Sequence, residues 1–204
     1  MIAIVDYGVG NLFSLRASLD HLGLKSIVTG EKCELERAKK LILPGVGAFG
    51  DAAEKLKDAG LFDFLKEQAA LGKPILGICL GMQLLFEKSS EYGEHEGLAL
   101  IPGAVCPLAA DLSEGLKVPH MGWNALRIVQ NDPIVKYIQR NAHMYFVHSY
   151  YAKGCEDALL ADAEYGVAVP ALVKKGSVYG AQFHPEKSGP AGLSILKAFG
   201  ELPC

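Results

Sequence analysis

The chain has 204 residues, of which 50% are apolar and 21% charged, and its formal net charge is −3. This composition is typical of a globular protein with one full core, and the slightly acidic balance gives no reason to expect nucleic acid or an anionic membrane as partner. No apolar stretch reaches the length of a membrane span, and Met1 leads into an apolar segment without a basic region or cleavage signal. We therefore expect a single domain, residues 1–204, that acts in the cytoplasm.

The cysteines are odd in number and widely scattered, at positions 33, 79, 106, 155 and 204. No Cys-x-x-Cys pair exists, so neither a zinc site nor a thioredoxin-like redox site is indicated. We expect five thiols, at most one of them reactive, and neither a metal nor a cofactor.

The first elements are a predicted buried strand at 2–5, a glycine-rich turn at 6–11 and a helix with leucines at helical spacing that ends at Gly23. The Gly8-Val9-Gly10 sequence invites a dinucleotide-binding interpretation. However, Phe13 stands where that fingerprint has its third glycine, and no acidic residue is placed at the end of the next strand. A tight turn, or a loop that faces a partner, is the better interpretation.

Strand and helix then alternate as far as residue 78. We expect strands at 26–29, 41–43 and 74–78, a short polar helix at 34–40 and a long amphipathic helix at 51–70. This alternation predicts an α/β fold with a largely parallel central sheet and helices on both faces. Active sites of such sheets lie beyond the carboxyl ends of the strands.

After about residue 90 the pattern changes to short strand-like segments with Pro and Gly turns. We expect strands at 98–101, 123–129, 144–150 and 178–183, and helices at 133–139 and 191–199. This half is predicted to extend the sheet with antiparallel or mixed strands.

Cys79 stands between a predicted strand and a predicted helix at 82–87, with Gly77 before it and Gly81 after it. Gly-x-Cys-x-Gly is the thiol counterpart of the strand–turn–helix elbow that carries serine in hydrolases. A helix N-terminus favours the thiolate, and the backbone N–H of Leu80 can point at an oxyanion. The alternative is that Cys79 is a small buried apolar residue.

A nucleophilic cysteine needs a base, and the base needs a residue that orients it. His184 follows the strand at 178–183 and precedes Pro185 and Glu186, and Pro185 favours extended backbone before it. In an extended chain residues two apart point the same way, so Glu186 can hold the His184 ring. A solvated turn is the alternative, and we expect His21 and His95 to be surface residues.

Three motifs in this order resemble the class I (triad) glutamine amidotransferase family: Pro44-Gly45-Val46-Gly47, Gly77–Gln83 and His184-Pro185-Glu186. Alone, the first motif reads equally well as a plain turn that ends a strand. The resemblance covers essentially the whole chain. It implies Cys79 as nucleophile, His184 as base and Glu186 as its orienter. It also implies oxyanion or glutamine contacts at Val46, Gly47, Leu80 and Gln83.

Further segments are similar to the glutaminase subunits of imidazole glycerol phosphate synthases: Asp6–Asn11, Pro119–Asn124, Tyr145–Tyr150 and Lys187-Ser188. This similarity implies glutamine contacts at Ser149 and Tyr150. It also implies a joint with a (β/α)8 synthase subunit, made by Asn11, Met121, Trp123, Tyr145 and Lys187. From the residues alone, a core tryptophan and a solvated lysine are the simpler interpretations. The 88–97 loop is the least family-like part.

The resemblance implies that glutamine is hydrolysed to glutamate and that the ammonia passes to the synthase subunit. There it would yield imidazole glycerol phosphate and aminoimidazole carboxamide ribotide, in histidine biosynthesis. Two rival interpretations remain: another enzyme on the same scaffold, such as a different amidotransferase glutaminase or a γ-glutamyl hydrolase, and a binding module with an inert triad.

Overall fold

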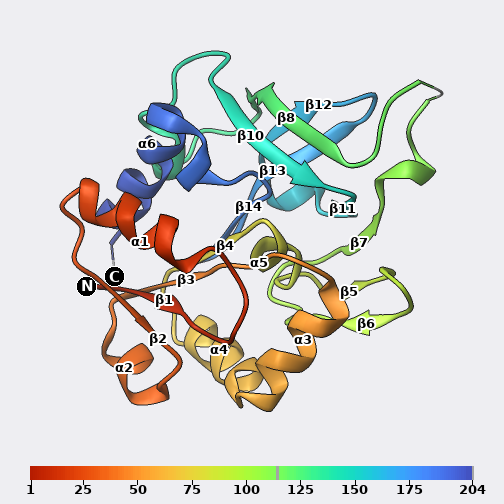
Figure 1. The fold of residues 1–204 in the computed structure, drawn as a ribbon. Coiled ribbons are helices and arrows are strands. Elements are labelled where there is room, and N and C mark those ends of the chain that lie inside the picture. Colours follow the sequence, from red (N-terminus) through yellow and green to blue (C-terminus); the bar gives the residue numbers. More distant parts are fainter. Residues whose placement is uncertain (114, 204) are drawn as a thin grey trace.

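A computed structural model describes residues 1–113 and 115–203, and its centre is an eight-stranded sheet (Figure 1). The strand order is β2–β1–β3–β4–β14–β13–β12–β9. The strands of this sheet are β1 (Ile2–Val5), β2 (Ser26–Thr29), β3 (Lys40–Leu43), β4 (Ile75–Ile78), β9 (Arg127–Ile128), β12 (Leu159–Glu164), β13 (Ala168–Lys175) and β14 (Val178–Ala181).

The sheet is parallel from β2 to β14 and antiparallel from β14 to β9. Helices cover both faces, with α1 and α6 on one side and α2, α3 and α4 on the other (Figure 1). The predicted fold class is confirmed. The helices are α1 (Leu12–His21), α2 (Lys32–Arg37), α3 (Phe49–Asp58), α4 (Leu61–Ala70), α5 (Leu80–Gln83) and α6 (Gly189–Glu201).

Successive side chains of the buried strands point to opposite faces of the sheet, and they form the two apolar clusters against which the helices pack. In β1, Ala3 and Val5 enter the cluster under α2, α3 and α4, whereas Ile2 and Ile4 enter the cluster under α1 and α6. Because a sheet covered on both faces buries every side chain, its strands read as continuous apolar runs. None of the helices in the described residues is long and apolar enough to cross a membrane.

Two smaller sheets flank the carboxyl edge of the large one. One pairs β8 (His120–Ala125) with β10 (His143–His148), and the other has the order β11–β7–β5–β6. The strands of the second are β5 (Lys88–Ser89), β6 (His95–Glu96), β7 (Ala104–Pro107) and β11 (Tyr150–Lys153).

Several predicted elements differ from the observed ones. The helix at 51–70 is two helices, α3 and α4, because Gly60 between them adopts a left-handed conformation with φ 66°. Residues 98–101 form no strand, and the helix at 133–139 is only a 3₁₀ turn, Pro133–Val135. The predicted strands at 123–129 and 144–150 are each divided into two, and β12 and β13 were not predicted.

The pairing of β4 with β14 brings distant segments together. Gly180 pairs with Gly77 and Ala181 with Ile78, and the backbone N–H of Cys79 donates to the Ala181 carbonyl over 2.7 Å. The chain after β14 therefore leaves the sheet beside Cys79.

Gly81 offers a test of this packing. A Cβ atom at Gly81 would collide with the Leu43 carbonyl, which belongs to the rigid end of β3. We expect Gly81→Ala to lower the free energy of unfolding by more than about 3 kcal/mol in denaturant titrations. The matched control is Gly72→Ala, where φ is +82° but nothing lies within 4 Å of the new Cβ, and it should cost only about 1 kcal/mol. Equal losses in the two variants would contradict the tight contact at Gly81.

Candidate active site

Cys79 stands on a strained turn at the carboxyl end of β4. Its backbone has φ 54° and ψ −113°, a conformation that non-glycine residues rarely adopt. The helix that follows is α5, a single turn at Leu80–Gln83, so the predicted helix at 82–87 is wrong. Because α5 is so short, its dipole is small. The first amide bonded within α5 is that of Gln83, to the Cys79 carbonyl, which leaves the Leu80 N–H at the free end of the helix.

His184 lies between Cys79 and Glu186. Its Nδ1 is 2.9 Å from Glu186 Oε1, and its ring lies with the Cys79 side chain at the wall of one cavity. His184 and the Glu186 side chain are both buried. The structure therefore brings together the three residues that the sequence motifs selected, in the order nucleophile, base and orienter.

The chain reaches this arrangement by a different route from the one expected. His184 is extended, but Glu186 belongs to a 3₁₀ turn at Pro185–Lys187 rather than to an extended segment. The turn is fixed by Ser188, whose hydroxyl donates to the His184 carbonyl over 2.6 Å. Alternation along a strand therefore does not explain why Glu186 faces His184.

The charge balance favours a protonated imidazole. Burial lowers the pKa of His184, but hydrogen bonds and the negative charges of Cys79 and Glu186 outweigh burial and raise that pKa to about 9. At neutral pH the ring is therefore an imidazolium that can donate a proton beside the sulfur.

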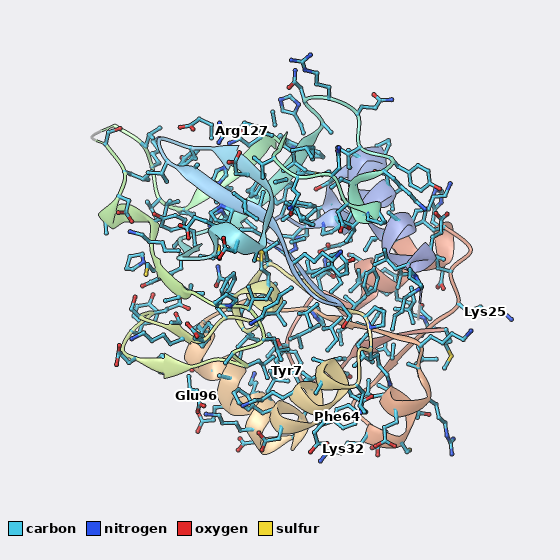
Figure 2. All side chains as sticks on the ribbon, turned by 180° about the vertical axis from the view of Figure 1, so that it is seen from behind. Tyr7, Lys25, Lys32, Phe64, Glu96 and Arg127 are labelled. Atoms are coloured by element: carbon cyan, nitrogen blue, oxygen red, sulfur yellow. The ribbon has the colours of Figure 1, made fainter. Side chains whose placement is uncertain are left out.

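The Pro44–Gly47 loop is packed directly on the elbow. A Cβ atom at Gly45 would lie 2.6 Å from the Gly81 nitrogen, so only glycine allows this approach. The buried Tyr7 hydroxyl donates to the Pro44 carbonyl over 2.7 Å. Figure 2 shows Tyr7 inside the fold, whereas Lys25 reaches outward at the edge of the molecule.

A cavity of about 320 Å³ opens at this point, large enough for a small ligand. Cys79 and His184 line it together with all six residues predicted to hold the oxyanion or glutamine: Val46, Gly47, Leu80, Gln83, Ser149 and Tyr150. Gln83 uses both hydrogens of its amide internally, on the Tyr150 carbonyl and on Gln182 Oε1, each over 3.0 Å. What it can offer a ligand is its side-chain oxygen.

The sequence analysis missed four residues that line the cavity: Glu91, Pro119, Val147 and His148. Glu91 lies in the 88–97 loop, and its carboxylate accepts from the Phe49 N–H over 2.7 Å. Several glutamates stand in or beside that loop, and no local pattern distinguishes Glu91 from the others. His95, expected at the surface, is half-buried with its ring against Gly50, whereas His21 is exposed as expected.

Four of the five residues predicted to face a partner belong to strands β8 and β10 or to the turn after His184. Trp123 pairs with Tyr145, their ring centroids are 6.0 Å apart, and the Lys187 ammonium lies 6.0 Å from the Tyr145 ring. Met121 and Trp123 are 61% and 56% exposed, so the tryptophan is not a core residue. The fifth, Asn11, caps α1 with its side chain.

The other described cysteines lie outside this cavity. Cys33, Cys106 and Cys155 are free, and burial, followed by the charge of Glu156, raises the pKa of Cys155 to about 12. Cys155 is therefore an inert thiol at neutral pH. The predicted fifth thiol, Cys204, lies outside the described residues.

The chain is similar to known proteins over nearly its whole length. The chain is 50% identical over 202 residues to an imidazole glycerol phosphate synthase subunit HisH of Geobacillus kaustophilus, covering 98% of this chain and 95% of that one. It is 52% identical over 205 residues to the subunit of the same name from Bacillus licheniformis, covering 99% and 96%. A crystal structure of a glutamine amidotransferase has the same fold, with a TM-score of 0.75 at 22% identity over 98% of both chains. Residues 3–201 match the family described as glutamine amidotransferase class-I, and the chain belongs to this family.

Proposed function

We propose that this chain is the glutaminase subunit of an imidazole glycerol phosphate synthase and acts in the cytoplasm. Similarity over nearly the full length to relatives of that name supports the assignment. The observation that carries the chemistry is His184, which lies between the Cys79 sulfur and the Glu186 carboxylate at the wall of one cavity.

In the first half of the reaction the Cys79 thiolate attacks the side-chain amide carbon of glutamine. A C–S bond forms, and the carbonyl electrons move to oxygen. The N–H of Leu80 and one from Val46 or Gly47 hold that oxyanion. His184 then gives its proton to the amide nitrogen, the C–N bond breaks and ammonia leaves.

In the second half water cleaves the thioester. His184, now neutral, takes a proton from the water as it attacks the thioester carbon. The C–S bond then breaks, glutamate is released, and the thiolate and the protonated His184 are restored. Glu186 keeps the Nδ1–H directed toward itself, so that Nε2 faces the reacting atoms. These steps need hydrogen-bond donors, one thiolate and one imidazole.

Glu91 is suited to hold the α-ammonium group of glutamine. It is the carboxylate among the residues that line the cavity, and it is largely buried. A buried carboxylate at the cavity wall favours a ligand with a cationic group and disfavours dicarboxylic acids that lack an ammonium group. Ser149, between β10 and β11, and Tyr150, the first residue of β11, also line the cavity and can supply polar contacts.

The partner, a (β/α)8 synthase subunit, would bind the face made by Asn11, Met121, Trp123, Tyr145 and Lys187. The Tyr145 carbonyl accepts from the His184 N–H over 3.0 Å, so this face is bonded directly to the triad segment. Ammonia released at Cys79 would be passed to the partner directly, because in bulk water it is protonated and loses its nucleophilicity. The partner would use it to make imidazole glycerol phosphate and aminoimidazole carboxamide ribotide.

The Pro44–Gly47 loop is placed to act as a switch. A Cβ at Gly10 would lie 2.9 Å from Pro44 Cβ, so the turn before Asn11 packs against the loop that carries an oxyanion donor. A partner that moves this turn would also move the loop. The loss of one oxyanion donor typically costs about 10²–10³ in rate.

The experiment measures glutamate release from glutamine by the chain alone, with the (β/α)8 subunit, and with that subunit and its ligand bound. We expect weak hydrolysis by the chain alone and a rise of about 10²-fold or more in the liganded complex. Equal turnover in all three mixtures would exclude the switch. Absence of hydrolysis in every mixture would exclude the glutaminase itself.

Replacement of Trp123 tests the partner face. An exposed aromatic residue at the centre of an interface typically contributes 2 kcal/mol or more, so we expect Trp123→Ala to weaken the complex by about 30-fold. The matched control is Leu71→Ala, because Leu71 is 79% exposed but lies at the end of α4. Titration calorimetry of both variants against the synthase subunit checks the result. An unchanged dissociation constant for Trp123→Ala would place the interface elsewhere.

A further inference from the structure

Two buried histidines form a pair beside the cavity. His120 in β8 and His148 in β10 are opposite each other, and they are 2% and 6% exposed. The His120 ring is stacked between Phe146 and Tyr165, at centroid distances of 4.7 and 4.1 Å. His120 Nδ1 lies 3.0 Å from His148 Nε2. The reaction steps described above do not use either ring.

The hydrogen bonds of this pair have a defined direction. His148 Nδ1 lies 2.8 Å from the Tyr150 carbonyl oxygen, which can only accept, so the Nδ1 of His148 carries the proton. In a neutral ring Nε2 is then an acceptor, and His120 Nδ1 must donate to it. Both rings are thereby assigned as Nδ1–H tautomers.

Asn124 fixes the same direction from the other end. Its Oδ1 accepts from the Ala125 N–H over 2.8 Å, which settles the orientation of the amide. Its Nδ2 donates to the Glu164 carbonyl over 2.8 Å and faces His120 Nε2 at 3.4 Å. A proton on either Nε2 would meet another donor. Burial agrees with neutral rings, because it lowers the pKa of His120 to about 4 and, together with the His120 charge, that of His148 to about 3.

The chain of hydrogen bonds continues from Tyr150 to the sulfur. The Tyr150 carbonyl accepts from Gln83 Nε2 as well as from His148, and the same Gln83 amide donates to Gln182 Oε1. With its oxygen occupied, Gln182 directs its Nε2 at the Cys79 sulfur, 3.9 Å away. Gln182 is fully buried, so no water competes for this contact.

We propose that His120 and His148 are positioning residues, held as neutral Nδ1–H tautomers, that fix the Tyr150 carbonyl and through it the Gln83 and Gln182 amides beside Cys79. Their effect on turnover rests on the proposed glutaminase function. Their tautomeric state does not.

The first experiment measures ring nitrogen shifts in the full chain labelled with ¹⁵N-histidine at pH 7. We expect both rings to show a protonated Nδ1 and an unprotonated Nε2, with signals assigned from the spectra of His120→Phe and His148→Asn. A protonated Nε2 on either ring would overturn the inference. This result does not depend on whether the chain hydrolyses glutamine.

The second experiment compares turnover in the complex with the synthase subunit. His120→Phe keeps the aromatic stack but loses the donor, His148→Leu loses the bond to Tyr150, and His148→Asn keeps an amide donor in the place of Nδ1. We expect kcat to fall about fivefold or more in the first two variants, with KM within about twofold, and to stay within about twofold of wild type in His148→Asn. His21→Gln, on the exposed end of α1, is the control.

Two outcomes would overturn the positioning role. One is an equal loss of kcat in His148→Leu and His148→Asn, which would assign the effect to packing. The other is an unchanged kcat with a raised KM, which would make His148 a simple wall of the cavity. A wild-type complex that releases no glutamate would instead overturn the proposed function, and the tautomers measured by NMR would still decide the structural part.

Discussion

Replacement of Cys79 by alanine should abolish glutamine-dependent synthesis while synthesis from added ammonium salts continues. The thiolate forms the bond to the substrate carbon, and no other cysteine among the described residues lines the cavity. The loss of a catalytic nucleophile costs about 10⁴-fold or more in kcat. The synthase subunit keeps its own site, so free ammonia still reacts there.

The measurement is product formation by the complex with glutamine and, separately, with an ammonium salt at alkaline pH. Cys33→Ser is the matched control, because Cys33 is an exposed thiol remote from the cavity. Loss of both activities in Cys79→Ala would mean that the cysteine supports the structure of the complex. Retention of both would mean that another group attacks glutamine.

Replacement of Glu186 by glutamine should lower kcat by about 10²- to 10⁴-fold without preventing folding. The carboxylate holds the Nδ1–H of His184 and stabilises its charged form, whereas an amide can present a donor to the same nitrogen and favour the wrong tautomer. The variant should also lose the high pKa of His184, about 9, in part, because the Glu186 charge contributes to it. Kinetics over a range of pH with Glu67→Gln, an exposed glutamate of α4, as control check both effects.

Glu186→Gln should also change how the free energy of unfolding depends on pH. The folded pKa of His184 is raised above its ordinary value of 6.5, so the interaction with Glu186 stabilises the fold fully below pH 6.5 and is lost as the pH rises through about 9. We therefore expect Glu186→Gln to reduce the free energy of unfolding more at pH 6 than at pH 10. A penalty that grows toward pH 10 would contradict a protonated His184 in the folded state.

The sequence predicts the site better than it predicts the elements around it. Gly77 and Gly81 allow the tight turn at Cys79, because a Cβ atom at either position would collide with backbone atoms. The three motifs identify the residues that the sheet then brings together. The sequence predicts one helix at 51–70 because apolar periodicity continues on both sides of Gly60, and only the left-handed backbone of Gly60 separates α3 from α4. The sequence does not predict β13, because Pro170 interrupts a run of residues that is otherwise typical of a strand.

Glu91 and the His120–His148 pair required the structure for a different reason. Their roles depend on which side chains face each other across β8, β10 and the 88–97 loop, and such pairings are long-range. The sequence shows six histidines, of which only His184 has a carboxylate two residues away along the chain. A histidine that acts through a neighbour on another strand has no local signature.

The most direct test of the proposed attack by Cys79 on glutamine is covalent labelling of the wild-type complex with a diazoketone analogue of glutamine, followed by peptide mass spectrometry. We expect one adduct per chain, on Cys79, which forms together with the loss of glutamine hydrolysis and which excess glutamine prevents. An adduct on Cys33 or Cys106 that accompanies inactivation, with Cys79 unmodified, would contradict the account.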